Sequence, residues 1–343
     1  MEFLYEYGLF LAKIATVVVA VGIVIGLIAG AAMKGKSSKK GELYLENISE
    51  SKEQEIDDVK KAMLDKSQIK ALEKAEKKLK KAKSKAKDDE AKTKAKLFVI
   101  RFDGGVDAQE VESLREEISC IISVAEENDE VLINLESPGG VVHGYGLAAS
   151  QIDRLKNANL KVTVAVDKVA ASGGYMMACV ADKIISAPFA IIGSIGVVAQ
   201  IPNINRLLKK VDIDIEQHTA GDYKRTLTVL GENTDAGREK FKQELNETHD
   251  LFKQFVADHR PEVDIDKVAT GEHWYGTQAK DLGLVDEILT SDDFVLTNLT
   301  KYDVYKIEFK IKHNLAEKFG IAAELGLKRV FGVLSSWSVT NTK

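Results

Sequence analysis

Near the N-terminus, a run of 20 residues from Ile14 to Met33 contains no charged side chain. A helix of this length is about 30 Å long, which is the thickness of the hydrocarbon core of a bilayer. A helix of that length buried in a soluble protein would normally carry some polar residues. The run therefore predicts a membrane span.

A cleaved signal peptide is the alternative, because residues 29–31, Ala-Gly-Ala, have the small side chains of a cleavage site. A signal peptide begins with a positively charged region, whereas this chain begins with Glu2, Glu6 and one late lysine. An uncleaved anchor is therefore favoured. By the positive-inside rule, the lysines that follow the run would keep the rest of the chain in the cytoplasm; they are Lys34, Lys36, Lys39 and Lys40.

The next part of the chain is rich in lysine. From Lys60 to Lys96 there are 15 lysines and six acidic residues, a net charge of +9 in a chain whose total charge is −5. Apolar residues at near-helical spacing indicate a charged helix, which either contacts anionic lipid headgroups or is a solvated spacer. The mild total charge argues against a chain built to bind nucleic acid.

From Leu97 onward the pattern alternates between strands and helices. The strand-like runs end in glycine-rich turns and lead into helices, which indicates an α/β fold with both sheet faces covered. The predicted strands are 97–104, 130–135, 160–166 and 302–311, and the predicted helices are 111–124, 147–155, 175–181 and 234–259. An amphipathic segment, 316–334, comes last and suits a subunit contact or the membrane surface.

Two glycine turns follow strands, in Ser137–Gly140 and Ala170–Gly174. Glycine allows close approach of the backbone to a ligand and directs N–H groups into a cleft, where they can stabilise an oxyanion. Ser172 follows a strand and opens a helix. Its hydroxyl is a candidate nucleophile, and the alternative is a helix N-cap. The local sequence does not decide between the two.

A nucleophilic serine needs a base, and no histidine of the chain lies in a pattern that recommends it. A desolvated lysine can act instead if its pKa falls from about 10.4 toward about 7. Lys224 follows the strand-like run 213–218 and a glycine, as a site lysine would. The apolar segment Ser186–Pro202 contains glycines and prolines, so we expect a buried segment and not a second span. Ala187–Phe189 and Ile191 would line a groove for an extended peptide.

Five motifs then carry a resemblance to a known family. In chain order they are SPGG, AASGGYMMACVADKI, IGSIGV, GDYKR and GLVDEI. Together they resemble the signal peptide peptidase A family of membrane serine peptidases, and the anchor with its lysine-rich linker resembles the SohB-type branch. The interval of 52 residues between Ser172 and Lys224 fits the family pattern. The resemblance implies the Clp protease/crotonase-like fold, a superhelix of repeated ββα units.

The resemblance also implies a Ser/Lys dyad without a metal or cofactor. Lys168 and Lys183 lie closer to Ser172 in sequence, but neither matches the family position, so we expect both to be structural. The implied roles are nucleophile for Ser172, general base for Lys224, orientation of the lysine amine for Ser194, and oxyanion hole for the amides of Gly139 and Gly173.

The expected protein is therefore a membrane-anchored serine endopeptidase that hydrolyses extended hydrophobic peptides, such as remnant signal peptides or misfolded proteins. Family members form homo-oligomers, so we expect composite active sites. Accounts of the family favour a periplasmic catalytic domain on the bacterial inner membrane, although the basic flank argues for the cytoplasm. The predicted parts are an anchor (1–40), a helical linker (41–96), a catalytic domain (97–290) and a C-terminal strand and helix (291–343).

Two other functions use the same fold. A crotonase-like acyl-CoA enzyme would hold a thioester oxyanion with the same glycine amides, but it needs neither an anchor nor the Ser172/Lys224 pair. A non-catalytic membrane scaffold would have lost its activity, and the presence of both Ser172 and Lys224 argues against that alternative.

Overall fold

The computed structural model describes residues 6–11, 13–14, 16, 41–65, 67–69, 74 and 94–311. The chain divides into two compact units: Leu43–Phe309, and Met1–Glu42 together with Lys310–Lys343. Apart from Ile14 and Thr16, the predicted span at 14–33 lies outside the described residues, as do most of the lysine-rich stretch and the segment 316–334. Within the described part of the chain, no helix is both long and apolar enough to cross a bilayer.

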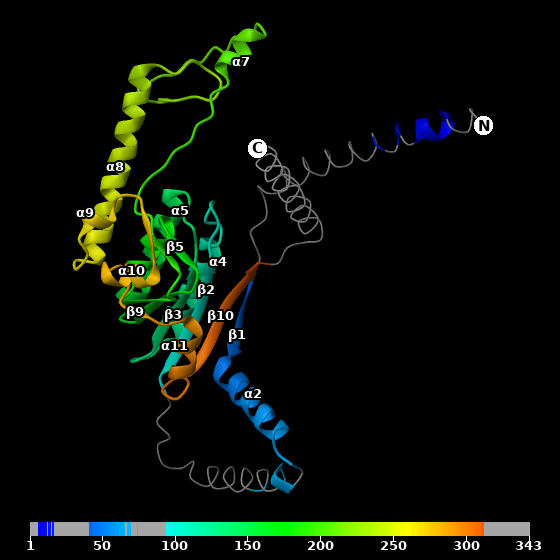
Figure 1. The fold of residues 1–343 in the computed structure, drawn as a ribbon, viewed down its shortest axis with the longest axis vertical. Coiled ribbons are helices and arrows are strands. Elements are labelled where there is room, and N and C mark those ends of the chain that lie inside the picture. The colour runs from blue at the N-terminus through cyan, green and yellow to red at the C-terminus, as the bar shows by residue number, and fades with distance from the viewer. Residues whose placement is uncertain are drawn as a thin grey trace, which may run out of the picture. The chain divides into compact units, whose positions relative to one another are not determined.

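A seven-stranded sheet organises the larger unit (Figure 1). The strand order is β1-β10-β2-β3-β4-β6-β9, and every neighbouring pair from β10 to β9 is parallel. Helices α4 (Val111–Val124) and α5 (Val142–Asn157) join β2 to β3 and β3 to β4, which confirms the predicted α/β class. The strands are β1 Gly41–Asn47, β2 Lys96–Asp103, β3 Glu130–Glu136, β4 Lys161–Val166, β6 Lys183–Ser186, β9 Glu287–Ile288 and β10 Asp303–Ile311.

Successive apolar side chains of the central strands point to opposite faces of the sheet, so each face has its own hydrophobic core. In β2, Phe98 and Ile100 belong to the larger core, whereas Leu97 belongs to the smaller one. The larger core includes residues of α4, α5 and α6 (Gly173–Ala178). The smaller core is covered by residues of α2 (Ile48–Ala62) and α11 (Ser291–Asn298). Successive side chains of a strand point to opposite faces, so both faces are buried, as the sequence predicted.

A small second sheet lies beside the first. It has the order β5-β7-β8, with β5 (Val169–Ala171) parallel to β7 (Ile191–Gly193) and β7 antiparallel to β8 (His273–Tyr275). An isolated parallel bridge between Ser137 and Ala170 links the end of β3 to β5. This bridge brings the two glycine turns of the sequence together.

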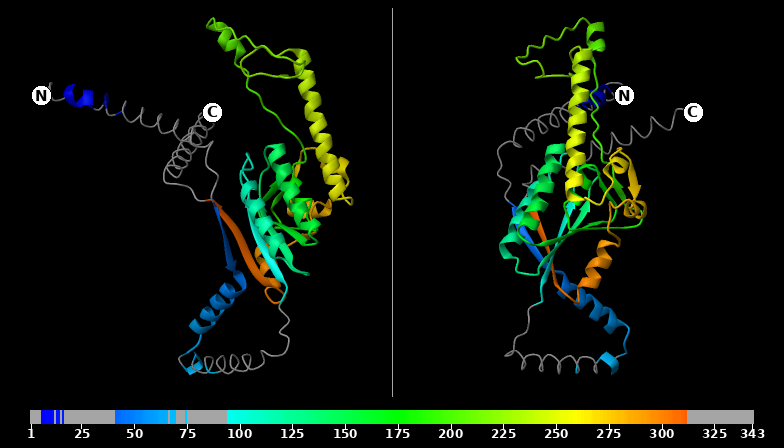
Figure 2. Two further views of the ribbon diagram at one scale, coloured as in Figure 1. Left: turned by 180° about the vertical axis from the view of Figure 1, so that it is seen from behind. Right: turned by 90° about the vertical axis from the view of Figure 1, so that its left-hand side faces the viewer.

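A long helix, α8 (Asp235–His259), projects from the sheets (Figures 1 and 2). Its C-terminal half contributes Phe252 and Val256 to the larger core. The short helix α7 (Asn205–Lys210) and the chain that joins it to α8 lie beyond the end of α8 that is far from the sheets (Figure 1). The remaining helices are α9 Ile265–Val268 and α10 Gly276–Asp281.

One element differs in type from the sequence analysis, and another is a strand as predicted but has a partner that the sequence did not indicate. Residues Gly41–Asn47, expected within the helical linker 41–96, form the edge strand β1, and Ile48–Ala62 form helix α2. Most of the charged helix predicted for Lys60–Lys96 lies outside the described residues. The predicted last strand is confirmed as β10, and it pairs with β2, with Asp303 opposite Lys96. The sequence does not indicate this pairing, because the two strands are about 200 residues apart and local residue patterns do not identify distant partners.

Glu117 on α4 predicts a pH dependence of stability. Its side chain is buried and accepts the N–H of Phe309 at 2.8 Å. Burial, with a smaller contribution from Glu308, raises the pKa of this carboxyl from 4.5 to about 7. The folded chain therefore keeps a proton that the unfolded chain releases, so stability falls as pH rises between about 4.5 and 7, by up to about 3 kcal/mol.

The test is the unfolding free energy of the full chain in detergent at pH 5 and pH 8. Glu117→Gln keeps an acceptor for Phe309 and is expected to lose less stability than the wild type over this range. Glu116→Gln, on the exposed side of the same helix, is the control and should behave as the wild type. A Glu117→Gln variant with an unchanged pH slope would contradict the assignment.

Candidate active site

The ends of β3 and β5 hold the two glycine turns against each other. Ser137 N–H donates to Val169 O at 2.8 Å, and Ala171 N–H donates to Ser137 O at 3.0 Å. Gly139 has φ of +86°, and a Cβ added there would lie 2.7 Å from Ser172 Cβ. Only glycine combines this backbone conformation with so close an approach. The SPGG turn is therefore in direct contact with Ser172.

Ser172 occupies a strained turn between β5 and α6. Its φ is 51° and its ψ is −116°, a conformation that costs a non-glycine residue about 1–3 kcal/mol. Its N–H donates to Gly193 O at 2.7 Å, and its carbonyl accepts from Met176 N–H at 2.9 Å. Ser172 is the N-cap residue of α6, but its side chain makes no capping hydrogen bond. The residue is partly exposed, and no hydrogen bond engages its hydroxyl within the described part of the chain.

Ser194 lies next to Ser172 across the small sheet. The register pairs Ala171 with Gly193, so the residue that follows each of them is a serine. Ser194 also has a positive φ, of 52°, and its N–H donates to Glu272 O at 2.7 Å. The structure thus brings Ser172, Gly139 and Ser194 to one place, as the sequence predicted.

Lys224 is not part of this arrangement. It is exposed and belongs to the chain between α7 and α8, outside the strands and turns that hold Ser172. Its own N–H donates to Gly221 O at 3.2 Å, and within the described residues no hydrogen bond or ion pair joins Ser172 to a lysine or histidine. The role of Lys224 as base stays a prediction.

The backbone amides near Ser172 differ in what they bind. The N–H of Gly139 donates to Ser137 Oγ at 3.1 Å, so it is already engaged inside the protein. In the part of the chain that the structure describes, the N–H groups of Gly140 and Gly173 have no acceptor. Assignment of the oxyanion hole to Gly139 and Gly173 stays a prediction. Gly140 is a further candidate, which the second glycine of SPGG could have signalled.

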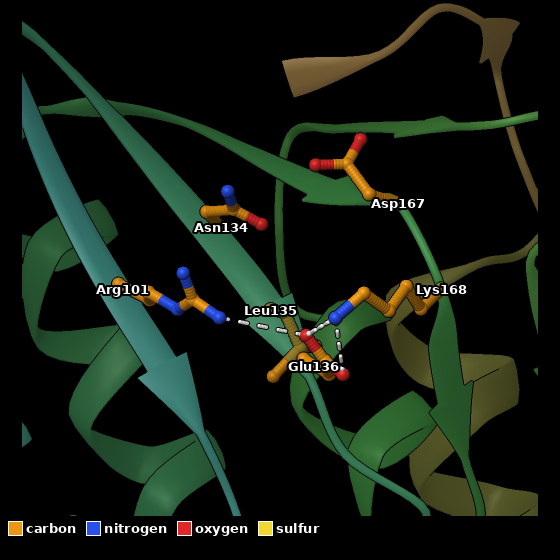
Figure 3. A pocket seen from close by; sticks show the side chains of 6 residues that line it. All are labelled: Arg101, Asn134, Leu135, Glu136, Asp167 and Lys168. Atoms are coloured by element: carbon orange, nitrogen blue, oxygen red, sulfur yellow. Dashed lines mark hydrogen bonds and ion pairs between the residues drawn. The ribbon is translucent and has the colours of Figure 1, made fainter. Parts of the chain in front are cut away.

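Charged side chains brace the strand ends that precede both turns (Figure 3). Lys168 Nζ lies 2.9 Å from one carboxylate oxygen of Glu136, and Arg101 lies 3.6 Å from the same carboxylate. Glu136 precedes the SPGG turn, and Lys168 precedes β5. Lys183 forms an ion pair with Glu287. Both lysines are therefore engaged in ion pairs, and their structural role stays a prediction.

Other candidate groups do not compete with Ser172. Cys179, just after α6, is fully buried, and burial raises the pKa of its thiol far above the neutral range. A thiolate is the reactive form, so this cysteine is not a nucleophile. Among the described residues, no group of three or more His, Cys, Asp or Glu side chains could hold a metal ion.

Comparison with known proteins identifies the family. The profile of the N-terminal part of peptidase family S49 matches residues 2–152, and the profile of peptidase family S49 matches residues 154–304. A probable protease SohB from Haemophilus influenzae is 53% identical over 331 residues, which are 94% of each chain. A probable protease SohB from Buchnera aphidicola subsp. Schlechtendalia chinensis is 51% identical over 305 residues, which are 87% of this chain and 100% of the relative.

Among solved structures, a membrane-bound stomatin-specific protease has a TM-score of 0.42 and 13% sequence identity, covering 62% of this chain and 98% of its own. The two SohB relatives extend over nearly all of the chain, and the family profiles include both glycine turns and Ser172. The chain therefore belongs to peptidase family S49, and it is a peptidase.

Proposed function

We propose that this peptidase is a membrane-anchored serine endopeptidase in which Ser172 is the nucleophile. The observation that carries the proposal is the strained turn at Ser172, whose hydroxyl makes no capping bond and whose Cβ is in contact with the SPGG turn. Strain of this kind persists where the surrounding structure holds a reactive group in place.

The proposed base is Lys224 of a neighbouring subunit. Lys224 is exposed and forms no hydrogen bond with Ser172 within the described residues, whereas a base must come within hydrogen-bond reach of the nucleophile. The projecting segment of the chain comprises α7, α8 and the residues between them. In a homo-oligomer, this segment of one copy could cover the glycine turns of the next copy. Lys224 would then reach Ser172 of the neighbouring subunit. In that contact, Ser194 beside Ser172 would orient the amine.

The reaction follows from these roles. Neutral Lys224 removes the proton from Ser172 Oγ, and the alkoxide attacks the peptide carbonyl. Backbone amides of the two turns, from Gly173 together with Gly140 or Gly139, stabilise the oxyanion. The protonated amine of Lys224 then donates its proton to the leaving nitrogen. Water attacks the acyl-enzyme with the same lysine as base, and Ser172 is restored.

Extended hydrophobic peptides are the proposed substrates. Phe189, Ile191 and Tyr275 are exposed apolar side chains on and beside the small sheet, and Phe189 and Tyr275 pack edge to face with ring centroids 5.9 Å apart. An extended peptide that adds to this sheet would cover them. Remnant signal peptides and misfolded proteins have this character.

The remaining parts of the proposal rest on sequence. The uncharged run Ile14–Met33 would anchor the chain in the bacterial inner membrane through lipid contact. We place the catalytic unit on the periplasmic side. The lysines that follow the span are the one feature of the sequence that argues instead for the cytoplasmic side. The fold would be the Clp protease/crotonase superhelix, and no nucleic acid is involved.

Mixing two inactive variants tests the composite site. Ser172→Ala and Lys224→Ala chains, denatured and reassembled together in detergent, are expected to regain about a quarter of wild-type cleavage, because that share of random interfaces pairs an intact serine with an intact lysine. Each variant reassembled alone is the control and should stay inactive. If the mixture stays as inactive as its parts while wild type treated in the same way recovers, the lysine does not come from a neighbouring subunit.

A further inference from the structure

A chain of buried hydroxyl groups lies behind the SPGG turn. Gly139 N–H donates to Ser137 Oγ at 3.1 Å, Ser137 Oγ lies 2.5 Å from Tyr145 Oη, and Tyr145 Oη–H donates to Gly105 O at 2.8 Å. A carbonyl only accepts, so the single proton of Tyr145 is used on Gly105. Ser137 must then donate to Tyr145 and accept from Gly139. The donor and the acceptor are therefore fixed in each of these three hydrogen bonds.

The same tyrosine also contacts the turn that carries the nucleophile. A Cβ added to Gly173 would overlap the Tyr145 ring, and one added to Gly174 would lie 2.6 Å from Ser137 O. Phe102 holds the ring edge to face at 6.4 Å between centroids. Tyr145 and Ser137 are both fully buried. Burial raises the pKa of Tyr145, so its hydroxyl remains a neutral donor at working pH.

We propose, on the basis of the serine peptidase function above, that Ser137 and Tyr145 are positioning residues of the oxyanion hole. They bind the N–H of Gly139 inside the protein, which leaves the N–H of Gly140 as the amide of this turn that receives the oxyanion. The Tyr145 ring sets the separation between this turn and the amide of Gly173. Neither side chain touches the reacting atoms. Their effect is to fix donors whose placement must be held within about 0.5 Å.

The first test compares the kinetics of two conservative variants of the full chain in detergent. Tyr145→Phe and Ser137→Ala are each expected to lower kcat about 10- to 100-fold with KM changed less than about 2-fold, since loss of a complete oxyanion donor costs about 10² to 10³. The double variant should be no slower than Ser137→Ala alone, because both changes break one chain of bonds.

Tyr175→Phe is the matched control. Tyr175 is also a fully buried tyrosine, and its hydroxyl donates to Leu284 O at 3.1 Å, away from both turns. Its removal costs a similar hydrogen bond, so kcat should stay within about 2-fold of wild type. An unchanged kcat in Tyr145→Phe would overturn the proposal. So would a rise of kcat in Ser137→Ala, which would mean that Gly139 itself is the oxyanion donor.

Amide hydrogen exchange of the segment 137–145 gives a readout without activity. Tyr145→Phe is expected to speed exchange in this segment at least about 10-fold more than Tyr175→Phe does, because the turn loses its anchor. Equal exchange in the two variants would overturn the proposal. Cleavage by wild type that does not depend on Ser172 would reject the proposed function, and the exchange comparison would still decide whether Tyr145 anchors the turn.

Discussion

Replacement of Ser172 by alanine is expected to lower kcat by at least about 10⁴-fold, with little change in KM, in cleavage of an unfolded protein by the detergent-solubilised chain. The size follows from the chemistry. Without Oγ there is no acyl-enzyme, and the only catalysis left comes from the amides of the two turns acting on an attacking water. The bound peptide still meets the same surface, so binding is retained.

The control must separate loss of the nucleophile from loss of the fold. Ser150→Ala removes an exposed serine of α5 whose hydroxyl donates only to Gly146 O, at 2.9 Å, and should leave kcat unchanged. The melting temperature of Ser172→Ala should equal that of the wild type within about 2 °C, because alanine keeps the same Cβ contact with Gly139. A folded Ser172→Ala variant that cleaves at the wild-type rate would remove Ser172 from the mechanism.

The sequence predicted the central α/β layers because their signals are local. Strands β2, β3 and β4 and helices α4, α5 and α8 lie within a few residues of the expected ranges, since the pattern of apolar and charged residues within each segment identifies them. The place of β10 between β1 and β2 was not predictable in this way. It depends on which distant strand offers a free edge, and that choice is made by tertiary packing.

The same distinction separates the predicted from the unpredicted parts of the site. Gly139, Ser172 and Ser194 lie together because each follows a short strand, and parallel strands place such positions at one edge. The hydroxyl chain through Tyr145 was missed, because it depends on how α5 packs behind the turn. Lys224 is the reverse case: its motif was recognised, yet within the described residues it forms no hydrogen bond or ion pair with Ser172.

Replacement of Lys224 by alanine is the second prediction with a large effect. If Lys224 is the base, its loss should lower kcat about 10³- to 10⁴-fold, since a serine hydroxyl without a base is a poor nucleophile. Lys224→Arg should be equally inactive, because a guanidinium keeps its proton at any pH that the protein tolerates. Lys210→Ala, an exposed lysine of the same projecting segment, is the control and should cleave as the wild type.

The pH profile distinguishes a base from a side chain that only binds substrate. A lysine base must be neutral to act, so wild-type kcat/KM should rise with pH. In Lys224→Ala this rise of kcat/KM with pH, the limb of the profile that reports the base, should disappear. The residual rate should instead be proportional to the hydroxide concentration. A fluorophosphonate probe, which forms a stable bond with an activated serine, should label Ser172 far more slowly in the variant. Labelling at the wild-type rate, with the limb intact, would mean that another group removes the proton from Ser172 and that Lys224 has a different task on the projecting segment.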